Sequence, residues 1–190
     1  MDPLRHRLIT EATRQFVERG FAGTSMREIA DACGVTKAAL YYHYPSKADL
    51  LLDIVGTYLD AMADAVAQGR AAHPTAAEQL SDIIGRLFAF PSEGRGVIRL
   101  ALHDLRHLPE AARATFGASY HERFLQPLGE IVRAGTASGE FGEHDPTTVV
   151  WIILGMLYPF LSHRSEEGAA RARADLVDVL LNGLRTRPAP

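Results

Sequence analysis

The chain has 190 residues, 47% of them hydrophobic and 23% charged, which is typical of a folded globular protein and excludes a disordered or collagen-like one. The formal net charge of −3 argues against a protein that coats nucleic acid with its whole surface, but it permits a local DNA-binding face. A lone cysteine cannot form an internal disulfide, and the longest apolar run, residues 149–161, is shorter than the ~20 residues that cross a bilayer. With no signal peptide at the N-terminus, we expect a cytoplasmic protein that has no membrane partner.

The first two predicted helices follow closely on one another. An apolar stripe with helical spacing covers about residues 4–19 and ends at Gly20, where glycine commonly stops a helix. Ser25 and Glu28 then have the spacing of a capping box, which predicts the start of a short helix over residues 26–33. The second helix is therefore expected to be only about two turns long.

A glycine turn separates the second helix from the third. Gly34 permits the tight turn, Thr36 can cap the next helix, and Pro45 ends it. Ser46, with Asp49 three residues later, predicts a longer fourth helix that runs to about residue 69.

The rest of the chain also has helical spacing, and no segment alternates like a strand. We therefore expect an all-α protein. Further helices are predicted at about residues 75–90, 93–107, 109–136, 146–162 (capped by Asp145) and 165–184 (opened by Ser165).

Residues 26–44 have the spacing of a helix-turn-helix, in which the second helix enters the major groove of DNA. At 100° per residue, Leu40 and Tyr44 turn inward while Ala38 and Tyr42 turn outward. The same spacing would also fit an ordinary corner between two surface helices. The side chains able to donate to phosphates or base edges are Thr36, Lys37, Tyr41, Tyr42, His43 and Lys47.

Three segments carry a resemblance to a known family: FAGTSMREIA at residues 21–30, CGVTK at 33–37 and LYYHYPSK at 40–47. They closely resemble the N-terminal domain of the TetR family of transcriptional regulators, over roughly residues 6–55. The resemblance implies a homodimeric, all-helical repressor with three DNA-binding helices and a larger C-terminal helical bundle that binds a small molecule and dimerises. We therefore expect a DNA-binding domain at residues 1–46 and a ligand-binding and dimerisation domain at 47–190.

Position by position, the resemblance also implies a set of DNA contacts. Many members have glycine where this chain has Ala38 and phenylalanine where it has Tyr44, so the fit to the groove and the packing are expected to differ slightly. The expected DNA-binding residues are Thr24, Thr36, Lys37, Ala38, Tyr41, Tyr42, His43 and Lys47.

Residues 149–161 are apolar nearly all round, as suits a helix packed between subunits, although the centre of a monomeric bundle would also explain it. The family places its dimer interface here, and Gly155 would permit close approach of two helices. The expected interface residues are Ile152, Gly155, Leu176, Val179, Leu180 and Gly183.

Aromatic residues gather in the C-terminal part, where they line a cavity or fill the core. His103 and His107 have a spacing that suits a metal, but no third ligand is predicted, so a hydrogen-bonded pair is favoured and no metal is expected. The expected ligand-binding residues are Phe88, Leu102, His103, Phe116, Tyr120, Phe124, Trp151 and Met156.

These observations predict a dimeric repressor that binds a palindromic double-stranded DNA operator and is released by a small apolar or aromatic effector, without a cofactor. The sequence has no nucleophile with a base, no paired carboxylates in an apolar setting and no phosphate loop after a strand. We therefore do not expect an enzyme. Two alternatives remain open: an architectural DNA-binding protein that needs no ligand, and an all-α enzyme that binds a small molecule.

Overall fold

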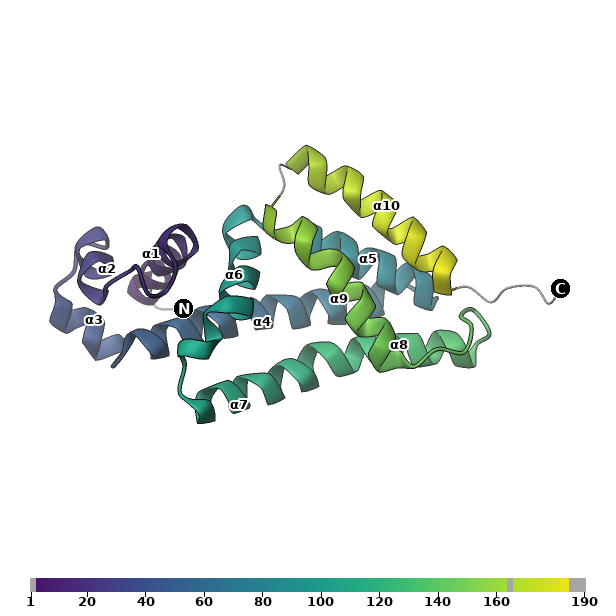
Figure 1. Ribbon diagram of the computed structural model, residues 1–190, viewed down its shortest axis with the longest axis horizontal. Coiled ribbons are helices and arrows are strands. Elements are labelled where there is room, and N and C mark those ends of the chain that lie inside the picture. Colours follow the sequence, from purple (N-terminus) through teal and green to yellow (C-terminus); the bar gives the residue numbers. More distant parts are fainter. Residues whose placement is uncertain (1–2, 164–165, 185–190) are drawn as a thin grey trace. The chain divides into compact units, whose positions relative to one another are not determined.

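The computed structural model describes residues 3–163 and 166–184, and within them regular structure is helical, with no β-strand. This confirms the all-α class. In chain order the elements are α1 (Pro3–Arg19), α2 (Met26–Ala32), α3 (Lys37–His43), α4 (Lys47–Ala72), α5 (Ala76–Phe88), α6 (Ser92–His103), the 3₁₀ turn η1 (Leu105–His107), α7 (Glu110–Tyr120), the π turn η2 (His121–Leu125), α8 (Gln126–Ala137), α9 (Pro146–His163) and α10 (Glu166–Leu184) (Figure 1).

The helices form two compact units. The first unit contains the residues up to Tyr58 together with Pro91–Gly117, and the second contains Leu59–Phe90 together with the residues from Ala118 onward. Helix α4 contributes its first half to one unit and its second half to the other. The predicted division into a DNA-binding domain at residues 1–46 and a ligand-binding domain at 47–190 is a division by function, which these packing units do not test, so it stays a prediction. No helix in the described ranges has the length and apolar character needed to span a membrane.

The first unit is held together by one apolar core beneath α1, α2, α3 and the start of α4. Its side chains include Leu8, Phe16, Ile29, Leu40 and Leu50, all of them fully buried. Burial of each such side chain stabilises the fold by about 1.5–3 kcal/mol. Helix α1 also packs against α6, so α6 belongs to this unit although it is distant in sequence.

The predicted caps of the short helices are confirmed. Ser25 and Glu28 form a reciprocal capping box at the start of α2, and the Thr36 hydroxyl accepts a hydrogen bond from the Ala39 N–H at the start of α3. Gly20 and Gly34 have φ angles of 76° and 66°, which favour glycine at the two turns. The two helices of the motif are thus fixed at their ends by local chemistry.

In the second unit α5 packs against α8 and α10, and α9 packs against α8 and α10. The turn after α8 supports this arrangement, because the Glu140 carboxylate accepts hydrogen bonds from the Ala76 and Ala77 N–H groups at 2.9 and 2.8 Å. Phe141 is buried beneath α8, where Gly135 leaves room for its ring. The turn at residues 139–142 therefore caps the start of α5 through Glu140 and contributes Phe141 to the core.

Three predicted helices differ in detail. Helix α4 continues to Ala72, beyond the expected end at about residue 69, and Gly69 serves close packing inside the helix, since a Cβ there would lie 2.4 Å from the Ile83 side chain. The helix expected at 93–107 ends at His103 and continues as η1, and the helix expected at 109–136 contains η2. The start of the last helix at Ser165 lies outside the described residues.

Candidate nucleic-acid interface

Helix α3 presents one face to the core and the opposite face to solvent. Leu40 and the Tyr44 ring that follows the helix are buried, while Ala38 is exposed and Tyr42 is 87% exposed. Tyr41 lies at the edge between these faces. This confirms the orientation predicted from helical spacing, in which an aromatic hydroxyl stands beside a small residue on the outward face.

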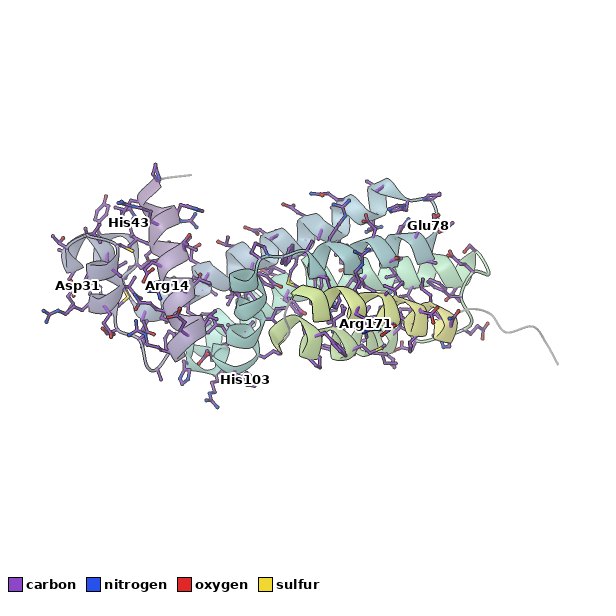
Figure 2. The ribbon with its side chains drawn as sticks, turned by 90° about the horizontal axis from the view of Figure 1, so that it is seen from above. Arg14, Asp31, His43, Glu78, His103 and Arg171 are labelled. Atoms are coloured by element: carbon purple, nitrogen blue, oxygen red, sulfur yellow. The ribbon has the colours of Figure 1, made fainter. Side chains whose placement is uncertain are left out.

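The polar residues of α3 are arranged in pairs along its exposed face. The Lys37 ammonium lies 5.4 Å from the centre of the Tyr41 ring, a cation–π distance. Tyr42 and His43 meet edge to face with ring centres 5.6 Å apart, and Figure 2 labels His43 on this helix. These contacts limit the rotamers of the side chains before any ligand arrives, which lowers the entropy cost of binding.

Thr24, an expected DNA contact, has a second role in the fold. Its side chain is buried and its hydroxyl lies within donating distance of the Gln15 and Gly20 carbonyl oxygens, at 3.2 and 3.1 Å. These bonds fix the loop between α1 and α2. In this conformation the Thr24 hydroxyl is bonded within the fold and is not available at the surface.

Lys47, at the start of α4, is bound to the same loop. Its ammonium donates to the carbonyl oxygens of Phe21 at 2.7 Å and Thr24 at 2.8 Å, and it lies 4.3 Å from the centre of the Phe21 ring. Burial lowers the pKa of this lysine. Lys47 therefore fastens the loop to α4, a role that sequence reasoning missed because the loop carbonyls carry no sequence signal.

A groove of about 550 Å³ runs between this loop and helix α3. Its lining includes the start of α2, where the Ser25 hydroxyl and the Glu28 carboxylate form the capping box. The groove is lined by Ala22, Gly23, Thr24, Ser25, Met26, Arg27, Glu28, Lys37, Tyr41, Pro45, Ser46 and Lys47.

A second polar cluster fixes the far end of α3. The Tyr44 hydroxyl donates to Asp53 on α4, and the Arg5 guanidinium on α1 pairs with the other oxygen of that carboxylate, both at 2.5 Å. Burial, followed by the Asp53 carboxylate, raises the pKa of Tyr44. The tyrosine that stands where the family commonly has phenylalanine thus ties three helices together through its hydroxyl.

The eight expected ligand-binding residues are divided between the units. Leu102, His103 and Phe116 belong to the first unit, in which Leu102 and His103 are exposed on α6. Figure 2 labels His103 at the surface of that helix. The other five belong to the second unit and are Phe88, Tyr120, Phe124, Trp151 and Met156.

Within the second unit these five residues have different surroundings. Tyr120 packs against the buried Phe124 and shares a 2.6 Å hydrogen bond with the Tyr158 hydroxyl. Met156 borders a space of only about 10 Å³ between α9 and α10, which is too small for a ligand. Phe88 is buried in the core, and Trp151 lies beside a larger pocket on α9.

His103 and His107 do not share a continuous helix face, since α6 ends between them. His107 stacks on Phe21 with ring centres 5.3 Å apart and lies 3.7 Å from the Asp104 carboxylate. In the described part of the chain, no three His, Cys, Asp or Glu side chains are grouped to hold a metal ion. Cys33 is half-buried beside the core, and burial raises the pKa of its thiol.

Some of the expected dimer-interface residues are exposed at the surface, and others are buried within the fold. Trp151 and Ile152 on α9 are 54% and 51% exposed, and Val179 on α10 is 61% exposed. Gly155 and Gly183 are exposed as well. Leu176 and Leu180, by contrast, are buried, and they border the small space between α9 and α10.

Comparison with known proteins gives two family matches that together cover most of the chain. The model of bacterial regulatory proteins of the tetR family matches residues 8–54, and that of the tetracyclin repressor-like C-terminal domain matches residues 73–160. The transcriptional repressor KstR2 of Rhodococcus jostii is 26% identical over 141 residues, which cover 72% of this chain and 67% of KstR2.

Solved structures share the whole fold. PfmR, a TetR family transcriptional regulator from Thermus thermophilus, has a TM-score of 0.82 at 27% identity and covers 95% of this chain and 100% of its own. AibR in complex with isovaleryl coenzyme A and operator DNA has a TM-score of 0.79 at 25% identity and covers 96% and 98%.

Proposed function

We propose that this chain, which belongs to the tetR family of bacterial regulatory proteins, is a dimeric repressor that leaves a palindromic operator when a small effector binds. It is a DNA-binding transcriptional regulator, and its relatives are regulators rather than enzymes, so the enzyme alternative is set aside. Dimerisation, operator binding and release by an effector are the parts of this proposal that need testing.

The observation that carries the proposal is the outward face of α3. Tyr42 is almost fully exposed there, Ala38 leaves room beside it, and Lys37 and His43 extend the polar surface toward both ends of the helix. An exposed aromatic with no apolar neighbour to cover gains nothing for the fold, whereas in a major groove its hydroxyl can bond a base edge or a phosphate. We therefore assign base recognition to this face.

Backbone N–H groups at the capped starts of α2 and α4 complete the surface. They favour phosphate, and Lys37 has no ion-pair partner among the described residues. Two such motifs in a dimer would contact successive major grooves about 34–36 Å apart, which requires a palindromic site.

The exposed apolar face of α9 supports dimerisation. A lone Trp151 or Ile152 at the surface would need no explanation, but the two are adjacent, and Gly155 one turn away leaves space for a partner helix. Val179 and Gly183 offer a similar surface on α10. The interface that we propose therefore consists of these five residues, without the buried Leu176 and Leu180.

Effector release requires that the ligand bind one conformer better than another. A hundredfold preference corresponds to about 2.7 kcal/mol, enough to shift an operator equilibrium substantially. Helix α4 belongs to both units, so repacking in the second unit can move the recognition motif in the first. The complex of AibR with isovaleryl coenzyme A supports an effector with an apolar group.

The test begins with selection of bound fragments from bacterial genomic DNA, followed by footprinting to define the site. Mobility-shift titrations of that site are then run without and with isovaleryl coenzyme A, and with any small molecule that native mass spectrometry finds on the freshly purified protein. A palindromic footprint that weakens with effector supports the proposal. A binding isotherm that no effector changes would favour the ligand-independent architectural alternative.

A further inference from the structure

A pocket of about 220 Å³ opens in the second unit, between η2 and α8 on one side and the N-terminal half of α9 on the other. This volume is below the roughly 300–1,000 Å³ of pockets for drug-sized ligands, so the occupant has a single ring or a short chain. The pocket is lined by His121, Leu125, Gln126, Gly129, Arg133, Thr147, Val150 and Trp151.

The π turn forms one wall of this pocket. The Gln126 N–H donates to the His121 carbonyl oxygen five residues earlier, so one extra residue is accommodated and the helix is locally widened. His121 and Gln126 both line the pocket. A widened turn of this kind gives up regular hydrogen bonding, and such turns are found frequently at functional sites.

Arg133 gives the pocket an uncompensated positive charge. No Asp or Glu is among the lining residues, and Arg133 has no ion pair in the described part of the chain. Two acids near it in sequence have other partners: Glu130 pairs with Arg70 at 3.0 Å and accepts from the Gln126 amide at 3.4 Å, and Asp145 accepts from the Thr148 N–H at 2.7 Å.

Gly129 lies beside the Arg133 guanidinium at the pocket. A Cβ at Gly129 would be 3.6 Å from the Arg133 Nη1 atom, an ordinary contact distance, and both residues line the pocket. Around it the donors are an imidazole, an amide and a hydroxyl, and the apolar wall is Trp151 with Val150. An anion with an apolar body matches both parts of this lining.

We propose that the pocket binds a small organic carboxylate, whose carboxyl group pairs with Arg133 and whose apolar or aromatic body lies against Trp151. The planar guanidinium forms two parallel bonds to a carboxylate, and the apolar body packs against the part of the indole that borders the pocket. The role of this ligand as effector rests on the proposed function, whereas its binding does not.

The first experiment titrates the full-length protein with benzoate and with benzamide, which have almost the same shape but differ in charge. Trp151 is the only tryptophan, so its fluorescence reports on this pocket. We expect a saturable change with both and a dissociation constant at least tenfold lower for benzoate, which is about 1.4 kcal/mol. Equal affinities, or no saturable change, would overturn the proposal. Sedimentation under the same conditions checks that the oligomeric state does not change.

The second experiment removes the charge. Arg133→Gln should abolish the preference for benzoate while leaving benzamide binding and the thermal midpoint nearly unchanged, because Arg133 is exposed and forms no ion pair with any described residue. The matched control is Arg171→Gln, which removes an exposed arginine of α10 in the same unit (Figure 2) and should leave the preference intact. A preference that survives in Arg133→Gln, or that is also lost in Arg171→Gln, contradicts the assignment of the carboxylate to Arg133.

The third experiment separates binding from regulation. Mobility-shift titrations of the footprinted site with benzoate are compared for the unsubstituted protein and for Arg133→Gln. Release of DNA that depends on Arg133 supports the effector role. If benzoate binds through Arg133 but leaves DNA affinity unchanged, the site stands and its effector role is rejected. If the protein binds no DNA at all, the proposed function fails, but the fluorescence titration still decides whether the carboxylate site exists.

Discussion

At the scale of single residues, Tyr42 is the sharpest test of the DNA-binding face. Because its side chain projects away from the Leu40 side of α3, Tyr42→Ala should leave the thermal midpoint nearly unchanged and weaken operator binding by ~1–3 kcal/mol. Mobility-shift titration and thermal melting of the same preparation measure the two effects. An unchanged affinity would remove Tyr42 from the recognition surface.

Lys47 was expected to contact phosphate, and the structure adds bonds to two loop carbonyls. Lys47→Ala should therefore lower the free energy of unfolding by about 1–3 kcal/mol, since hydrogen bonds from a charged donor are lost, and operator affinity should fall with the loosened loop. Lys37→Ala is the matched control, because the Lys37 side chain is exposed: it should keep the stability and flatten the salt dependence of binding by about one unit. If the Lys47 variant is as stable as the parent, the loop contact is not important for the fold.

Tyr44 allows the hydroxyl bond to Asp53 to be tested apart from the packing of the ring. Tyr44→Phe keeps the buried ring and should lower the free energy of unfolding by ~1–2 kcal/mol, because the carboxylate loses one donor and retains Arg5. Urea denaturation measures this difference. The control, Tyr41→Phe, removes a hydroxyl from the edge of α3 and should not change the midpoint. If the two substitutions changed the free energy of unfolding equally, the bond between Tyr44 and Asp53 would not contribute specifically to stability.

At the scale of helices, two glycine substitutions compare packing with helix propensity. Gly135→Ala would place a Cβ 2.3 Å from the Phe141 ring and 2.9 Å from the Ala76 Cβ. This crowding should outweigh the gain in helix propensity and lower the free energy of unfolding by a net amount of about 1–3 kcal/mol. Gly117 has nothing within 4 Å of its Cβ position, and Gly117→Ala should instead stabilise α7 by about 0.5–1 kcal/mol. Opposite shifts of the thermal midpoint are expected, and a gain at Gly135 would contradict the close packing.

Local chemistry determined how well each helix could be predicted. Helix starts could be predicted at Ser25, Thr36 and Asp145 because a cap is a contact between residues that are neighbours in sequence. The predicted end of α4 at about residue 69 is early, since the glycine there serves close packing against Ile83 inside the helix. The π turn had no signal at all, since its extra residue is stabilised by tertiary packing rather than by residue type.

The candidate site shows the same limit. Helical spacing predicted which residues of α3 face outward, because the turn angle of a helix is fixed. It could not predict that Thr24 and Lys47 bond within the fold, since their partners are backbone carbonyls 9 and 23 residues away. Apolar spacing also placed Trp151 and Met156 among the eight expected ligand-binding residues, but it could not show that Trp151 borders a pocket of about 220 Å³ and Met156 a space of only about 10 Å³.

At the scale of the whole molecule, the central question is whether two copies associate through α9. Gly155 is exposed and has nothing within 4 Å of its Cβ position, so Gly155→Arg can be accommodated by a single folded chain. In a dimer formed on the Trp151 and Ile152 surface, the guanidinium would have to be desolvated without a partner, which is strongly unfavourable. We therefore expect this variant to sediment as a monomer at micromolar concentration, with the helical circular dichroism of the parent protein.

Gly117→Arg is the matched control for this substitution, because Gly117 is also an exposed helical glycine with open space, but on α7 rather than α9. It should sediment like the parent protein. A palindromic operator demands two recognition helices in a fixed relation, so the monomeric Gly155→Arg variant should also lose most operator affinity while keeping weak non-specific binding. If the variant remains dimeric, the subunits meet elsewhere, and the exposed apolar residues of α9 then require another partner.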